Sequence, residues 1–98
     1  MIRKANKYIV VCQQVLCSPG EAIRIHYGWD GEEFGARKAA IKHGFSVRGS
    51  DDFNVGVVQG GRLLSFDWME NPVGEDDESM AEIAEALGLE YEPAKERA

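Results

Sequence analysis

Two adjacent glycines, Gly60 and Gly61, constrain the fold of this chain more than any other feature. They separate two segments rich in apolar residues, Phe53–Gln59 and Arg62–Met69. Glycine adopts positive φ without steric cost, so two glycines in a row suit the tight turn between antiparallel strands. A β-hairpin is therefore predicted, ending at Asn71-Pro72. Alternation along its second strand predicts one face with Leu64, Phe66 and Trp68, and another with Leu63, Ser65, Asp67 and Met69.

The N-terminal part of the chain carries a second pair of strand signals. Lys7–Leu16 is rich in β-branched and aromatic residues, which favours a strand. Ser18–Gly20 has turn composition, and Glu21–Tyr27 then alternates between apolar and polar residues. These segments predict a second hairpin, the second strand of which is half exposed.

Two helices are expected, one between the hairpins and one after them. The first is predicted over Glu32–His43, with Asp30 as its N-cap and Gly44 as its stop. The second is predicted to begin at Ser79, which forms a capping-box pattern with Glu82. Its apolar stripe, at i, i+3, i+4 and i+7, consists of Met80, Ile83, Ala84 and Leu87, and Gly88 follows as a stop.

The order of these elements predicts an α+β fold. Ninety-eight residues suffice for one domain, here residues 1–98, with a folded core of about 7–89. The expected order is β-β-α-β-β-α, which gives a four-stranded, mainly antiparallel sheet with both helices against one face. Residues 90–98 are expected to form a frayed tail.

Charge is distributed unevenly along the chain, which has a formal net charge of −6. Residues 1–50 carry eight basic and four acidic side chains, whereas residues 51–98 carry three basic and thirteen acidic ones. Residues 63–94 contain no lysine or arginine at all. This stretch is interpreted either as a surface for a basic partner protein or as charge that confers solubility.

The candidate protein-binding residues lie in that acidic stretch: Asp67, Glu70, Glu75, Asp76, Asp77, Glu78, Glu82 and Glu85. Three of them, Glu78, Glu82 and Glu85, fall at i, i+4 and i+7 and so form one ridge. Like charges at this spacing cost a helix a few tenths of a kcal/mol per pair. Trp68 and Met69 are a candidate hot spot if they are exposed together.

A nucleic-acid-binding surface is the alternative interpretation. The first predicted helix carries Arg37, Lys38 and Lys42, and Arg24 precedes it. Basic residues close to aromatic ones are typical of proteins that bind single strands. The negative net charge opposes a polyanion, so a protein partner is favoured.

Metal-binding and catalytic signals are sparse. The soft metal ligands are Cys12, Cys17, His26 and His43, and their spacing matches no common zinc module. The chain lacks the nucleophile-elbow, phosphate-loop, zinc-protease and dinucleotide-binding motifs. We therefore expect a non-enzymatic protein without cofactor or metal, with a Cys17–His26–Asp30 enzyme site as the remaining alternative.

The compartment expected from the sequence is the cytoplasm. No apolar run approaches the roughly 20 residues that span a bilayer, and the basic N-terminal start lacks a signal-peptide cleavage site. Two cysteines are few for a small secreted domain, which favours reduced thiols.

The layout of the chain resembles small orphan proteins of phages and mobile elements, including anti-CRISPR proteins. The resemblance is carried by the short helical segment GARKAAIKHGF (Gly35–Phe45), the hairpin FNVGVVQGGRLLSFDW (Phe53–Trp68) and the acidic end. It covers most of the chain as a layout and not as a motif, so it assigns no role to an individual residue. The resemblance implies a non-enzymatic inhibitor that docks on a CRISPR–Cas effector. A homodimer is compatible with it.

Overall fold

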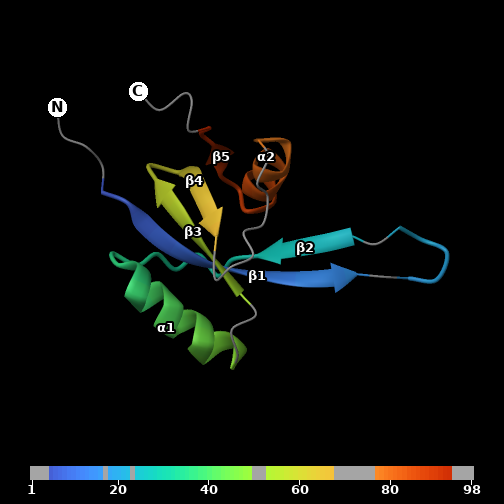
Figure 1. Cartoon of the computed structure of the whole chain (residues 1–98), viewed down its shortest axis with the longest axis horizontal. Helices are drawn as coiled ribbons and strands as arrows, with labels where there is room; N and C mark the ends of the chain where they lie inside the picture. The colour runs from blue at the N-terminus through green and yellow to red at the C-terminus, as the bar shows by residue number, and fades with distance from the viewer. Residues whose placement is uncertain (1–4, 17, 23, 50–52, 68–76, 94–98) are drawn as a thin grey trace.

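The computed structural model describes residues 5–16, 18–22, 24–49, 53–67 and 77–93. The elements in chain order are β1 (Lys7–Leu16), β2 (Arg24–Gly28), α1 (Arg37–Arg48), β3 (Phe53–Gln59), β4 (Arg62–Asp67), α2 (Asp77–Ala86) and β5 (Glu90–Tyr91) (Figure 1). The α+β class is confirmed. The prediction of four strands is wrong, because five strands form one sheet in the order β2-β1-β3-β4-β5.

Strand β1 joins the two hairpins into this sheet. Its first part, Lys7–Cys12, pairs antiparallel with β3, and its last part, Cys12–Leu16, pairs antiparallel with β2 on the opposite side. The β1–β2 arm therefore extends away from the rest of the sheet (Figure 1). Between β3 and β4 the predicted hairpin is confirmed, because Gly60 and Gly61 have φ angles of 58° and 80°.

The fifth strand is the part of the sheet that sequence reasoning missed. β5 pairs parallel with β4 where a frayed tail is predicted. The Glu90 N–H donates to the Gly61 carbonyl at 3.2 Å, and the Glu92 N–H donates to the Leu63 carbonyl at 3.1 Å. Two residues are too short a segment for any strand periodicity, so this pairing depends on α2 returning the chain to the edge of β4.

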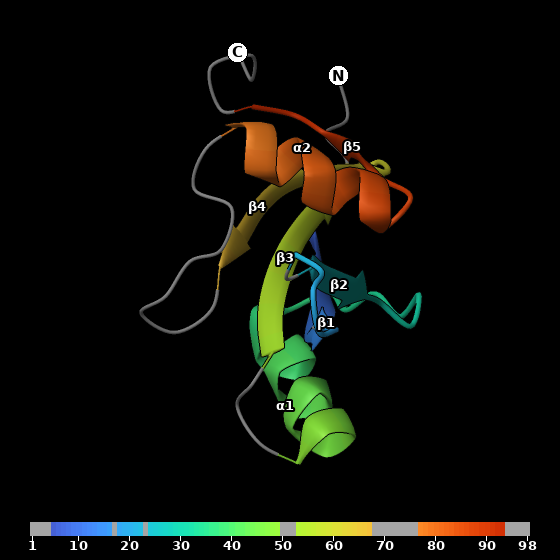
Figure 2. The same cartoon turned by 90° about the vertical axis from the view of Figure 1, so that its right-hand side faces the viewer.

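The helices cover opposite faces of the sheet, contrary to the expectation that both cover one face. Ile9 and Val11 of β1 pack in one core cluster with Met80, Ile83 and Ala84 of α2. Val10, which lies between them, packs on the other face with Ala40 of α1 and with Phe53 and Val55. Figure 2 shows the two helices well separated, with the sheet between them. The run Ile9–Val11 is therefore buried on both sides.

A β-bulge changes which residues of β4 share a face. Val57 lies opposite Ser65, whereas Val58 lies opposite Leu63, so Leu64 is an extra residue on the β4 side. An extra residue inverts the alternation beyond it. Leu63 and Phe66 consequently lie in the same cluster beneath α2, although strict alternation predicts opposite faces.

Helix α1 is shifted from its predicted span of 32–43 because Gly44 is not a stop. Gly44 is buried inside the helix, and a Cβ atom there would overlap the ring of Phe53. The glycine is thus required for close packing and not for helix termination. The helix ends at Gly49, with a φ of 71°, and its N-cap is Ala36, not Asp30.

Helix α2 has the predicted apolar stripe, with Met80, Ile83 and Ala84 all buried. It begins at Asp77, two residues before the predicted N-cap Ser79, so Ser79 lies within the first turn.

The packing of Gly44 predicts that Gly44→Ala destabilises the protein. Forcing a methyl group into a packed core costs about 1–3 kcal/mol, and the overlap with three atoms of the buried Phe53 ring places this case at the upper end, above the gain of about 1 kcal/mol in helix propensity. Urea denaturation of the variant should show this loss. Gly35→Ala is the matched control, because a Cβ atom at that position would have no atom within 4 Å and the φ of Gly35 is not positive. Equal stability of Gly44→Ala and wild type would contradict the packing argument.

Candidate functional site

The outward side of α2 presents a row of carboxylates, here called the acidic stripe: Glu78, Glu82 and Glu85. All three are exposed, whereas Met80 and Ile83 on the other side of the same helix are buried. The 3.6-residue period explains this division, since positions i, i+4 and i+7 share one side. Asp77–Ala86 contains no basic residue, so no partner for these carboxylates is supplied by the helix itself.

The other predicted acidic residues are placed only in part. Asp67 is the last residue of β4 and Asp77 is the first residue of α2. Glu70, Glu75 and Asp76 lie outside the described residues, as does the candidate hot spot Trp68–Met69. The structure therefore groups three of the eight predicted carboxylates into one described surface.

Glu90 of β5 and Glu92, which follows it, add carboxylates next to α2, and both lie close to Arg62 of β4. The Arg62 Nη1 atom lies 3.5 Å from Oε1 of Glu92, and its Nε atom lies 3.9 Å from Oε2 of Glu90. Arg62 is the only basic residue between positions 49 and 94. Because it lies beside two carboxylates, this edge of the protein retains a negative charge.

The predicted basic residues are placed only in part. Lys38 and Lys42 are exposed on the outward side of α1. Arg37 is half-buried, and its guanidinium carbon lies 5.5 Å from the centre of the Tyr8 ring, a cation–π contact. Arg24 is the first residue of β2. Of the four predicted basic residues, two therefore point outward together.

An unpredicted side-chain hydrogen bond connects the segment before α1 to the helix. Oδ2 of Asp30 lies 2.8 Å from Nε2 of His43, and Oδ1 of Asp30 accepts a hydrogen bond from the Glu32 N–H at 2.9 Å. Phe34 stacks obliquely on the His43 ring, with 4.9 Å between ring centres. The Phe34 backbone is also tied to Tyr8 of β1 by two hydrogen bonds of 2.8 and 2.9 Å.

These contacts lower the pKa of the Asp30 carboxyl. Partial burial by itself raises the pKa of the Asp30 carboxyl, but the hydrogen bonds from His43 and the Glu32 N–H outweigh it and lower this pKa below its ordinary value. A histidine–carboxylate pair can orient a general base. Here it joins two elements of the scaffold, so we assign it a positioning role. The sequence predicted Asp30 as a helix N-cap, and it gave no signal for the contact of Asp30 with His43, thirteen residues further along the chain.

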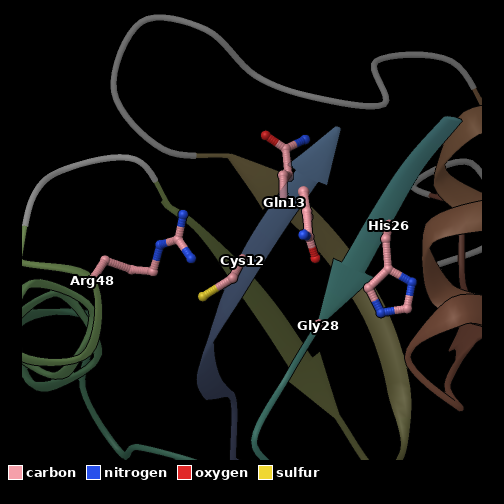
Figure 3. Close-up of a pocket in the computed structure, with 6 residues that line it drawn as sticks. Cys12, Gln13, His26, Gly28 and Arg48 are labelled. Atoms are coloured by element: carbon pink, nitrogen blue, oxygen red, sulfur yellow. The ribbon is translucent and has the colours of Figure 1, made fainter. Parts of the chain in front are cut away.

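The described cysteine and histidine candidates lie at two separate places. Cys12 and His26 line a shallow cleft of about 360 Å³ with Gln13, Gln14, Gly28 and Arg48. Arg48 and His26 flank it on opposite sides (Figure 3). His43 belongs instead to the Asp30 pair, and Cys17 lies outside the described residues. Across the described part of the chain, no three side chains of the His, Cys, Asp or Glu type are grouped to hold a metal.

Comparisons with protein-family models, with curated proteins and with solved structures found no match to this chain. Neither of the helices that the structure describes is long and apolar enough to cross a membrane. Function must therefore be argued from the surfaces themselves.

The Asp30–His43 pair predicts a stability difference that depends on pH. Because the pKa of Asp30 is lowered by folding, its ionised form stabilises the protein above the ordinary carboxyl pKa, and this contribution is lost as pH falls through the lowered value. Asp30→Asn should cost about 0.5 kcal/mol near pH 6, since the pair is partly solvent-exposed. Urea denaturation at several pH values measures this. A cost that stays constant down to pH 2 would contradict the assignment.

Proposed function

We propose that this protein is a non-enzymatic binding module that docks on a basic surface of another protein. The observation that carries the proposal is the acidic stripe of α2. Glu78, Glu82 and Glu85 repel one another at a cost to the helix, and the helix includes no lysine that relieves it. Such an arrangement is expected where a cationic partner supplies the compensating charge.

The proposed partner is a nucleic-acid-binding effector, of which a CRISPR–Cas effector is the candidate. Proteins that hold phosphate backbones present lysine and arginine surfaces. A row of carboxylates matches such a surface in charge, and occupying it excludes the nucleic acid. The resemblance to small phage inhibitors supports the same class of partner, and the proposed site of action is the cytoplasm.

The exposed charges of the two helices lie on different sides of the molecule, which favours docking by a single face. Helix α1, which carries the exposed Lys38 and Lys42, lies across the sheet from α2, as Figure 2 shows for the two helices. A protein that mimics a nucleic acid over its whole surface would carry acidic residues on both helices. The proposed contact is therefore a local protein–protein patch centred on α2.

Direct nucleic-acid binding is less well supported. The two outward lysines of α1, Lys38 and Lys42, form a small footprint for a polyanion, since Arg37 is engaged with Tyr8. Each phosphate contact is made by one basic side chain, so affinity and salt dependence scale with their number. We expect no mobility shift of single-stranded DNA by the purified protein at about 50 mM salt.

The test is inhibition of effectors by charge-reversed variants. Purified Cas9-type and multi-subunit CRISPR effectors are loaded with fluorescent target DNA, and the protein is added in increasing amounts. Wild type should reduce DNA binding, and Glu78→Lys/Glu82→Lys should weaken the inhibition by on the order of a hundredfold, because a charge reversal at a charged interface is repulsive.

The matched control is Glu21→Lys/Glu33→Lys, which makes the same change in net charge at exposed positions outside α2. Equal loss in both double variants would show a non-specific effect of net charge. Absence of inhibition and of co-elution with both effector types would refute the assignment of this partner.

A further inference from the structure

The two helices carry stripes of residues with the same spacing and opposite charge. On α1 the residues at i, i+4 and i+7 on the outward side are Lys38, Lys42 and Phe45, all exposed. On α2 the residues at the same spacing form the acidic stripe. Each stripe lies opposite the buried side of its helix, which carries Ala40 and Gly44 in α1 and Met80 and Ile83 in α2.

The stripe on α1 has an apolar end that the core does not cover. About one turn of α1 follows Gly44, and there Phe45, at the end of the stripe, and Val47, on the other side of the helix, are 44% and 54% exposed. They are the large hydrophobic residues most exposed in the described part of the chain. One edge of Phe45 contacts the Phe53 ring, at 5.4 Å between centres, and the rest faces solvent. Exposed apolar area next to lysines is typical of a contact surface.

These stripes cannot meet within one molecule. The sheet separates α1 from α2, and the two helices lie at different ends of the molecule (Figure 2). A contact between them therefore needs two copies of the chain.

We propose that the Lys38–Lys42–Phe45 face of α1 binds the acidic stripe of α2 in a second copy. The lysines pair with the glutamates, and the exposed part of Phe45 packs against Ala81, which is exposed beside the stripe and small enough to allow close approach. Charge complementarity selects this occupant, since the matching surface is present in every copy. The contact does not require an outside partner, although it uses the same side of α2 as the proposed docking.

A contact between two different surfaces is heterologous, and it has a defined consequence for assembly. A pair of copies joined in this way retains one unused stripe of each kind, one on each copy, so association continues head-to-tail into short chains or closes into a ring. Because the pairs are exposed, the association is weak and is screened by salt, with a Debye length of about 10 Å at 0.1 M. A basic partner on α2 competes with it.

The test is sedimentation velocity of the full chain across concentration. At about 50 mM salt the mean mass of wild type should rise above that of the monomer, and at about 500 mM salt the association should weaken by on the order of tenfold. Lys38→Glu/Lys42→Glu alone and Glu78→Lys/Glu82→Lys alone should each remain monomeric. An equimolar mixture of these two variants should associate again, because the reversed stripes are complementary.

The controls separate this inference from the proposed function and from misfolding. Glu21→Lys/Glu33→Lys has the net charge of the α2 variant and should still associate, and circular dichroism with urea denaturation verifies that each variant is folded. Monomeric wild type at low salt and about 1 mM, or association that survives Lys38→Glu/Lys42→Glu, overturns the head-to-tail contact. Neither result affects inhibition of an effector, which the α2 variant tests independently.

Discussion

Strand β1 has apolar residues on both faces, and the rest of the structure depends on its pairing with β3. Val10 lies opposite Val55 in that pairing and faces α1, whereas Ile9 and Val11 face α2. Burying a medium-sized apolar side chain contributes about 1.5–3 kcal/mol. Three consecutive residues that are buried on alternating sides therefore require a cover on each side, and the two helices provide it.

This requirement separates the charged surfaces. Had both helices packed on one face, the lysines of α1 and the glutamates of α2 would lie near one another and neutralise each other. With the sheet between them, the uneven charge of the chain becomes two surfaces of opposite sign. The acidic surface is positioned rigidly, because Met80, Ile83 and Ala84 fix the rotation of α2 about its axis. Both the proposed docking and the proposed self-association depend on that separation.

Local sequence signals predicted the elements that depend on local physics. The hairpin at Gly60-Gly61 follows from their tolerance of positive φ, and the orientation of α2 follows from its period of 3.6 residues. The prediction failed where a distant residue determined the outcome. From the sequence alone Gly44 is predicted to end the helix, but its close packing against Phe53 explains why a glycine stands there. Asp30 is likewise predicted to cap the helix, but its side chain pairs with His43. The order of apolar and polar residues along β4 does not reveal the β-bulge at Leu64.

The sequence by itself determined the α+β class, the strands β1 and β3, the hairpin at Gly60-Gly61, and the acidic stripe of Glu78, Glu82 and Glu85. These depend on backbone preference and on periodicity within one segment. The tertiary structure decided that the helices take opposite faces, that α1 continues to Arg48, and that a fifth strand joins β4 in parallel. Those outcomes depend on contacts between segments far apart in the chain, where burial and close packing outweigh local propensity.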